Sequence, residues 1–187
     1  MATSAQADAQ HKPRRQIAEP VEVVAGAPPN KGMEVTSPRR YGEQELAAFE
    51  TAMGVSLPPA YRRYLAVVGA GLQTGSMVCL LEDWCQPYFE DEIPKDFLLQ
   101  PFPHEHAWND RTLCDNSQGW QSAYFEKKWF CGSMRIGNLG CEGYDLLVIS
   151  GSERGNVWAD ERVSAGTGIF PRTGASGGRL SIGEYLG

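Results

Sequence analysis

Cysteine and histidine are the side chains of this sequence whose chemistry first suggests catalysis. The chain of 187 residues has five cysteines and three histidines. A thiol nucleophile needs a base within hydrogen-bond reach. Cys131 and Cys141 lie beside glycines, and His104 and His106 are the histidines that follow the first forty residues. No spacing connects these thiols to these bases. We therefore favour thiols that pack as small hydrophobic side chains, and a Cys/His enzyme is the least favoured hypothesis.

The same residues offer ligands for a metal. His104 and His106 would point to one side of a strand, and Cys114 follows nearby. A structural zinc site needs four converging ligands and closer cysteine spacing. We therefore expect a polar loop in which one histidine hydrogen-bonds the backbone. No metal and no other cofactor is expected.

A glycine-rich stretch at residues 67–75 resembles the phosphate-binding loop of dinucleotide-binding folds. Thr74 stands where the third glycine of that fingerprint belongs. The fingerprint also follows a strand and opens a helix, whereas here a helical pattern precedes the glycines and an apolar, strand-like run follows them. The expected structure is the end of a helix followed by a turn.

The densest concentration of charge lies between Glu82 and Asp115. Nine acidic and two basic residues give this stretch a net charge of −7, and six aromatic residues are interleaved with them. Acidic residues around aromatic anchors are typical of a surface that binds a basic protein. Alternatively, the aromatic rings pack inward and the acids only solvate the outer face. The candidate partner-binding residues are Glu82, Asp83, Trp84, Tyr88, Phe89, Glu90, Asp91, Glu92 and Asp96.

Composition limits the class of protein. Hydrophobic residues make up 42% of the chain, which suffices for the core of one domain. No run approaches the roughly 18 apolar residues of a membrane span. A net charge of −6 argues against a nucleic-acid binder with a broad basic face. The N-terminus lacks the apolar segment of a signal peptide, and the odd cysteine count predicts reduced thiols. We therefore expect a cytoplasmic protein that contacts neither nucleic acid nor membrane directly.

Residues 1–40 differ from the rest of the chain. They contain no aromatic residue, carry a net charge of +2 and show little periodic apolar pattern. Such a segment buries little apolar surface. We expect a flexible leader or surface strap at residues 1–40, followed by a single domain at residues 41–187.

Periodicity predicts the elements of that domain. Residues 43–53 read as an amphipathic helix that ends at Gly54. A second helix starts at the prolines of positions 58–59, with Tyr61, Tyr64, Leu65 and Val68 as its buried stripe. Strands are expected at 77–81, 134–137, 145–150 and 155–160, and helices at 118–129 and 180–186. Glycine-rich turns between the later strands predict antiparallel neighbours. This order of elements is typical of the α+β class.

Two stretches resemble the SUKH superfamily. The run from Leu57 to Leu65, followed by Gly69 and Gly71, is similar to the opening Leu-Pro-x-x-Tyr-x-x-Phe/Tyr-Leu…Gly-Gly of that family. Residues 136–151 and 155–160 are similar to its glycine-flanked strand pair, and Pro171 and residues 185–186 stand where members have a proline and a final helix. The resemblance covers residues 41–186. It implies an α+β fold with a mixed or antiparallel sheet and flanking helices.

The resemblance also implies a function. Bacterial members are typically immunity proteins that bind and neutralise a cognate toxin, often one that acts on nucleic acid, whereas fungal relatives regulate cell-wall synthesis. Catalytic residues are not usual in the family, so the resemblance implies no enzyme. The long stretch at residues 82–115 is where we expect partner specificity. A non-catalytic scaffold or regulatory module is the alternative function. Nothing in the residues distinguishes a monomer from a dimer.

Overall fold

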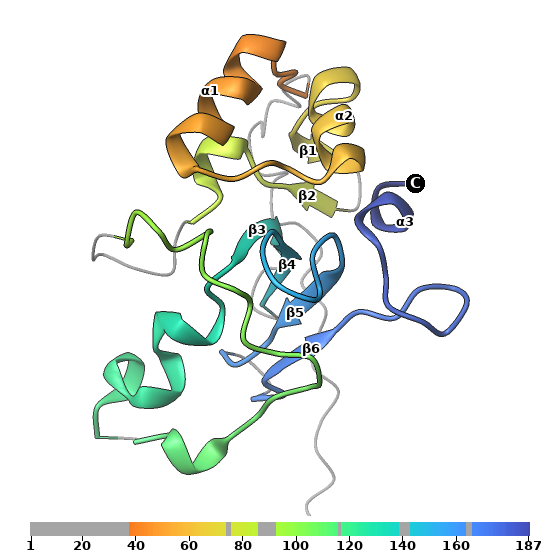
Figure 1. Ribbon diagram of the computed structural model, residues 1–187. Coiled ribbons are helices and arrows are strands. Elements are labelled where there is room, and N and C mark those ends of the chain that lie inside the picture. Colours follow the sequence, from red (N-terminus) through yellow and green to blue (C-terminus); the bar gives the residue numbers. More distant parts are fainter. Residues whose placement is uncertain (1–37, 74–75, 86–92, 116, 139–142, 164–165) are drawn as a thin grey trace, which may run out of the picture. The chain divides into compact units, whose positions relative to one another are not determined.

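The computed structural model describes residues 38–73, 76–85, 93–115, 117–138, 143–163 and 166–187. In these ranges two helices come first, six strands follow, and a short helix closes the chain (Figure 1). The helices are α1 (Glu43–Met53), α2 (Pro59–Val67) and α3 (Ile182–Leu186). The strands are β1 (Gly71–Gln73), β2 (Ser76–Val78), β3 (Ser133–Asn138), β4 (Tyr144–Val148), β5 (Val157–Asp160) and β6 (Ile169–Pro171).

Helix α1 begins and ends where the sequence predicts. The carboxylate of Glu45 accepts a hydrogen bond from the backbone N–H of Gly42 at 2.8 Å, which satisfies one of the unpaired donors of the first turn. Gly54 ends the helix in the left-handed region, at φ 67°, where a residue without Cβ is favoured. Leu46 faces the core and is fully buried.

Helix α2 starts at Pro59, as the paired prolines indicate. Tyr61 and Leu65 are fully buried, but Val68, expected in the same stripe, is 37% exposed. The helix ends at Val67, and Val68 is its C-terminal cap. Because α2 ends at the first residue of the glycine-rich stretch and β1 begins within that stretch, the expected end of the helix is confirmed. Within the described ranges, no helix has the length and apolar character needed to cross a membrane.

The six strands form one antiparallel sheet in chain order, from β1 to β6. The α+β class and the antiparallel pairing of successive strands are thereby confirmed. β1 and β6 were not expected as strands. Each has three residues, and the glycines and prolines around them hide any alternation of apolar and polar side chains.

The sheet is covered on both faces. Leu146 on β4 lies opposite Trp158 on β5, so these two side chains share one face, and the adjacent Asp145 points to the other. On the Trp158 face, the ring of Phe102 lies 5.0 Å from the Trp158 ring. On the Asp145 face, the hydroxyl of Tyr185 on α3 donates to the carboxylate at 3.0 Å. The long segment between β2 and β3 therefore packs on one face and α3 on the opposite one.

The predicted helix at 118–129 is wrong. The chain makes three separate 3₁₀ turns there, at Gly119–Gln121, Ala123–Phe125 and Lys127–Trp129. Extended residues interrupt them, with ψ 152° at Ser122 and 144° at Glu126. Within these separate turns Tyr124 packs into the protein with 1% exposure.

Candidate partner-binding surface

The stretch that the sequence marks as partner-binding begins at a 3₁₀ turn, Leu81–Asp83, directly after β2. Trp84 follows it and is 8% exposed. Its ring lies 6.1 Å from that of Phe97, and its carbonyl accepts from the N–H of Arg135 on β3 at 3.0 Å. The prediction that Trp84 is a surface anchor is therefore wrong, because its ring belongs to the hydrophobic core. Phe97 and Phe102 are buried as well, so these rings follow the inward-packing alternative.

Glu82 is exposed but tied to residues far away in the sequence. Its carboxylate accepts a hydrogen bond from the Tyr41 hydroxyl at 2.7 Å and pairs with the guanidinium of Arg39. The Tyr41 hydroxyl in turn accepts from the N–H of Leu81 at 2.8 Å. Partial burial raises the pKa of Glu82, but the bond from Tyr41 and the charge of Arg39 outweigh it, so the pKa lies below its ordinary value. Burial and the bond to Glu82 raise the pKa of Tyr41 to about 12. Glu82 thus holds the start of the domain against the 3₁₀ turn, a contact that the sequence did not reveal.

The other predicted residues divide into two groups. Asp83 is partly exposed and Asp96 exposed, and neither forms an ion pair with another described residue. Asp96 accepts a hydrogen bond from the side chain of Gln100 at 3.0 Å. The remaining five candidates lie outside the described residues: Tyr88, Phe89, Glu90, Asp91 and Glu92.

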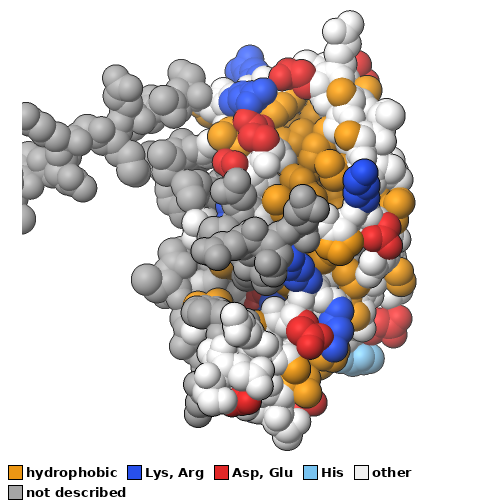
Figure 2. Space-filling view, turned by 90° about the vertical axis from the view of Figure 1, so that its left-hand side faces the viewer, with side chains coloured by type: hydrophobic (Ala, Val, Ile, Leu, Met, Phe, Trp, Pro, Cys, Tyr) orange, Lys and Arg blue, Asp and Glu red, His pale blue; other side chains and the backbone are white. Residues whose placement is uncertain are grey.

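Hydrophobic side chains gather on the side of the molecule where α1 lies. Figure 2 views that side and shows them bordered by acidic and basic side chains. Leu99 is 52% exposed, and its Cδ1 lies 3.3 Å from the position that a Cβ atom would take on Gly54. Met53 and Val55, on either side of Gly54, are partly buried. We call Met53, Val55 and Leu99 the apolar surface. The sequence did not reveal this apolar surface. Leu99 directly follows Phe97 and Leu98, which are buried, so the pattern indicates that all three residues are buried.

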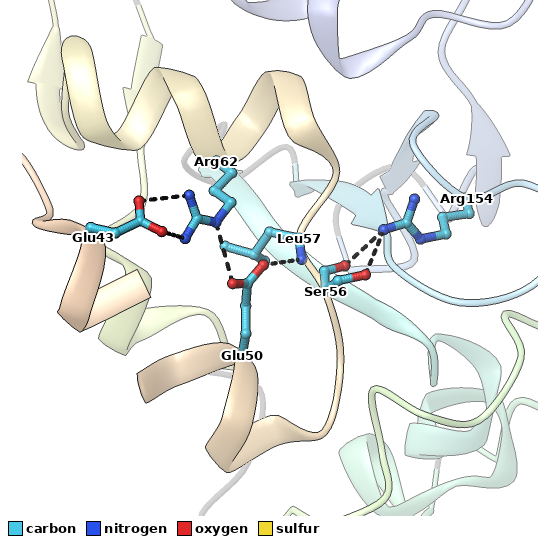
Figure 3. A network of polar contacts seen from close by, with 6 residues as sticks. All are labelled: Glu43, Glu50, Ser56, Leu57, Arg62 and Arg154. Carbon is cyan, nitrogen blue, oxygen red and sulfur yellow. Dashed lines mark hydrogen bonds and ion pairs between the residues drawn. The ribbon is translucent and has the colours of Figure 1, made fainter. Parts of the chain in front are cut away.

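Arginines neutralise the acids of α1. Arg62 on α2 pairs with Glu43 through two nitrogens, at 2.9 and 2.5 Å, and its Nε lies 3.2 Å from Glu50 (Figure 3). The second oxygen of Glu50 accepts from the N–H of Leu57 at 2.8 Å. From the connection between β4 and β5, Arg154 donates to the carbonyl that precedes Leu57, at 2.8 Å. The helix pair is therefore fastened by polar contacts, and these acids carry little uncompensated charge.

The acids of the sheet are matched in the same way. Arg172 lies 2.8 Å from Asp145, and Arg162 lies 2.7 Å from Asp160, with side chains 2% and 1% exposed. Arg162 also donates to the carbonyl of Tyr124 at 2.8 Å. This buried pair connects the end of β5 to the 3₁₀ turns.

Two of the cysteine and histidine candidates, His104 and Cys131, hydrogen-bond backbone carbonyls. His104 is buried, and its Nε2 lies 2.7 Å from the carbonyl oxygen of Trp129, so the expected backbone bond of one histidine is confirmed. His106 is exposed, and Cys141 lies outside the described residues. The Cys131 thiol donates to the carbonyls of residues 101 and 128. Burial raises the pKa of Cys131, and a thiol that resists ionisation is a poor nucleophile. In the described ranges, no three side chains of metal-ligand type converge.

Residues 174–178 match the Gly-x-Ser-x-Gly pattern of a hydrolase nucleophile elbow, which sequence reasoning missed. The elbow requires a strand before the serine and a helix after it. Here the residues form an exposed loop closed by pairing of Thr173 with Arg179. The N–H of Gly174 donates to the carbonyl of Gly178 at 2.9 Å. The pattern therefore belongs to a tight turn and lacks the geometry of an elbow.

Comparison with known proteins identifies one family. The model of the SMI1 / KNR4 family (SUKH-1) matches residues 42–167, a range that starts at α1 and ends just before β6. No curated protein and no solved structure matches the chain. The family-like residues Leu57, Tyr61 and Leu65 are all buried, so this motif serves the packing of α2.

Proposed function

Because the chain belongs to the SMI1 / KNR4 family (SUKH-1), we propose that it is an immunity protein. It binds a cognate toxin, one with a basic surface directed at nucleic acid, and neutralises it by covering that surface without covalent chemistry. The chain acts in the cytoplasm, as a stoichiometric inhibitor and not as an enzyme.

The observation that carries the proposal is the separation of matched from unmatched acids. Acids on α1 and in the sheet are paired with arginines. The stretch at residues 82–115 has nine acids and two basic residues. Glu82 pairs with Arg39, whereas Asp83 and Asp96 make no ion pair with another described residue. Charge that is not consumed internally is available to a partner. A toxin acting on nucleic acid needs cations that contact phosphate, and these are complementary to this stretch.

The apolar surface supplies the second component of such an interface. Binding energy concentrates at a few desolvated apolar residues, while the surrounding charges govern the rate of encounter and the specificity. Leu99 is exposed on the same short segment as Asp96. We therefore infer that Leu99 anchors the interface and that the acids between Asp83 and Asp96 supply its attraction for a basic partner. Electrostatic attraction speeds capture, which matters when free toxin is lethal.

The experiment uses the protein encoded next to this chain as the toxin. That protein is expressed in a sensitive bacterial host with and without this chain, and growth is recorded. Purified components are then mixed at increasing molar ratios, and toxin activity is measured. Inhibition complete at a one-to-one ratio is expected. Inhibition by much less than one equivalent would mean that the chain is an enzyme. Absence of both rescue and binding would contradict the proposal.

Charge variants locate the interface. Replacing Glu90, Asp91 and Glu92 by their amides is expected to slow association and to flatten its dependence on salt. The control variant has the same three-charge change at exposed acids outside residues 82–115, at Glu43, Glu126 and Glu184. Leu99→Ala is expected instead to weaken the binding free energy by about 2 kcal/mol, mainly through faster dissociation. If the test and control variants associate at equal rates, the acidic stretch is only a solvated face. Binding kinetics at low and high salt, with a melting curve for each variant, separate these outcomes.

A further inference from the structure

Leu99 lies on a turn whose backbone is fastened on both sides to the chain that follows β4. The carbonyl of Leu98 accepts a hydrogen bond from the hydroxyl of Ser150 at 2.6 Å. On the other side of Leu99, the N–H of Phe102 donates to the carbonyl of Ser150 at 2.9 Å. The N–H of Leu99 itself donates to the carbonyl of Asp96 at 2.9 Å, which closes the turn.

The backbone that follows Leu99 runs close against two glycines. A Cβ atom on Gly132 would lie 2.3 Å from the carbonyl oxygen of Gln100 and 2.6 Å from the backbone nitrogen of Phe102. A Cβ atom on Gly151 would lie 3.0 Å from that same nitrogen. Any side chain at either position therefore has to push this backbone away, and the push is larger at Gly132.

Both glycines stand at the same end of the sheet. The carbonyl of Gly132, directly before β3, accepts from the N–H groups of Ile149 and Ser150 at 2.8 and 3.0 Å, and Gly151 follows Ser150. Their φ angles are 69° and 104°, in the region that glycine enters at low cost. The missing side chains thus set how closely the backbone after Leu99 approaches the sheet.

This close approach places Leu99 on the end of α1. The Cδ1 atom of Leu99 lies 3.3 Å from the position that a Cβ atom would take on Gly54, while the residue stays 52% exposed. A displaced backbone would lift Leu99 from Gly54 and separate it from Met53 and Val55, the other members of the apolar surface.

We propose that Gly132 and Gly151 are positioning residues of the apolar surface, which fix Leu99 on the end of α1 before a partner arrives. The consequence for binding rests on the proposed function, whereas the position of Leu99 does not. A side chain already held in its bound place loses little conformational entropy on association. Gly132 is buried, so it acts on binding through the segment that it positions.

The test variants are Gly132→Ala and Gly151→Ala, each with a matched control. Gly119 and Gly155 have positive φ angles of 54° and 88°, and a Cβ atom on either would meet nothing within 4 Å. Gly119→Ala and Gly155→Ala therefore carry the backbone strain of an alanine at positive φ without the collision. Urea unfolding of all four variants shows which of them are folded under the conditions of the measurements.

The position of Leu99 is read without any partner. In the unchanged protein, nuclear Overhauser contacts are expected between the Leu99 methyl groups and the α-protons of Gly54, because these groups are in van der Waals contact. The contacts are expected to weaken or disappear in the two test variants and to persist in the two controls.

Binding to the toxin is the second measurement. The test variants are expected to bind about tenfold more weakly, and the controls to bind like the unchanged protein. Leu99→Ala sets the upper limit at about thirtyfold, which corresponds to about 2 kcal/mol. In a chain that already carries Leu99→Ala, the glycine substitutions are expected to have no further effect on affinity, because the side chain that they displace is absent.

Two results would overturn the proposal. The first is an unchanged contact between Leu99 and Gly54 in the folded test variants. The second is a loss of affinity that is equally large with and without the Leu99 side chain, which would mean that the glycines act on binding by another route. If Gly132→Ala does not fold, Gly151→Ala decides both measurements, because its collision is milder. A toxin that does not bind the unchanged protein would contradict the proposed function, and the Leu99 contacts then decide the proposal alone.

Discussion

The buried pair of Asp160 and Arg162 is expected to be the ionic contact on which the fold depends most. Arg162 donates to the Asp160 carboxylate through Nε at 2.8 Å and Nη2 at 2.7 Å. Its third donor, Nη1, reaches the carbonyl of Tyr124 at 2.8 Å. The perturbation is Asp160→Asn, which keeps the shape of the side chain and removes its charge.

The expected magnitude depends on burial. With the Arg162 side chain only 2% exposed, water cannot replace the lost carboxylate. Breaking a buried pair by removing one partner costs about 3–5 kcal/mol. Domains of this size have unfolding free energies of about 5–15 kcal/mol, so the variant loses a large fraction of its stability. Adding Arg162→Met removes the stranded charge, so the double variant is expected to be more stable than the sum of the single effects predicts.

Urea unfolding at neutral pH measures these free energies, with equal m-values as the sign that the same transition is compared. Glu43→Gln is the control, because it breaks the pair with Arg62 in which the Glu43 side chain is 75% exposed. An exposed pair contributes about 0–1 kcal/mol. If Asp160→Asn costs no more than Glu43→Gln, or if the double variant shows simple additivity, the account of a mutually dependent buried pair is refuted.

Trp158 is fully buried, so Trp158→Ala is expected to cost about 3–5 kcal/mol of unfolding free energy. Val163 is exposed, so Val163→Ala is expected to cost less than about 0.5 kcal/mol. Equal urea midpoints for the two variants would contradict the sheet assignment. Glu50→Ala leaves the N–H of Leu57 without its hydrogen-bond acceptor and is expected to cost about 1–3 kcal/mol of unfolding free energy in the same assay. Burial lowers the pKa of His104 below its ordinary 6.5, so the unfolded state binds more protons there and stability is lost as pH falls below about 6.5. Urea unfolding between about pH 8 and 5 is expected to show that His104→Gln loses less unfolding free energy on acidification than the unchanged protein does.

Local patterns in the sequence predicted those elements whose cause is itself local. The cap at Gly54 and the prolines at the start of α2 act through the backbone of a few neighbouring residues. The antiparallel order of β3, β4 and β5 follows from short apolar runs that are separated by glycine-rich turns. The turns at 119–129 escaped prediction because contacts with a distant segment shape them: the rings of Tyr124 and Trp129 both stack on that of Trp108. β1 and β6 escaped because three residues carry no periodic signal.

The candidate surface divides in the same way. The sequence by itself located the excess of acid at residues 82–115, because charge can be counted without a structure. Only the tertiary structure decided that Trp84 faces the core and that Glu82 is bound by Tyr41 and Arg39, since those partners lie about forty residues earlier in the chain. It likewise decided that Leu99 is exposed. Whether a side chain is buried or paired depends on which distant segments fold against it, and that information resides in packing and not in local pattern.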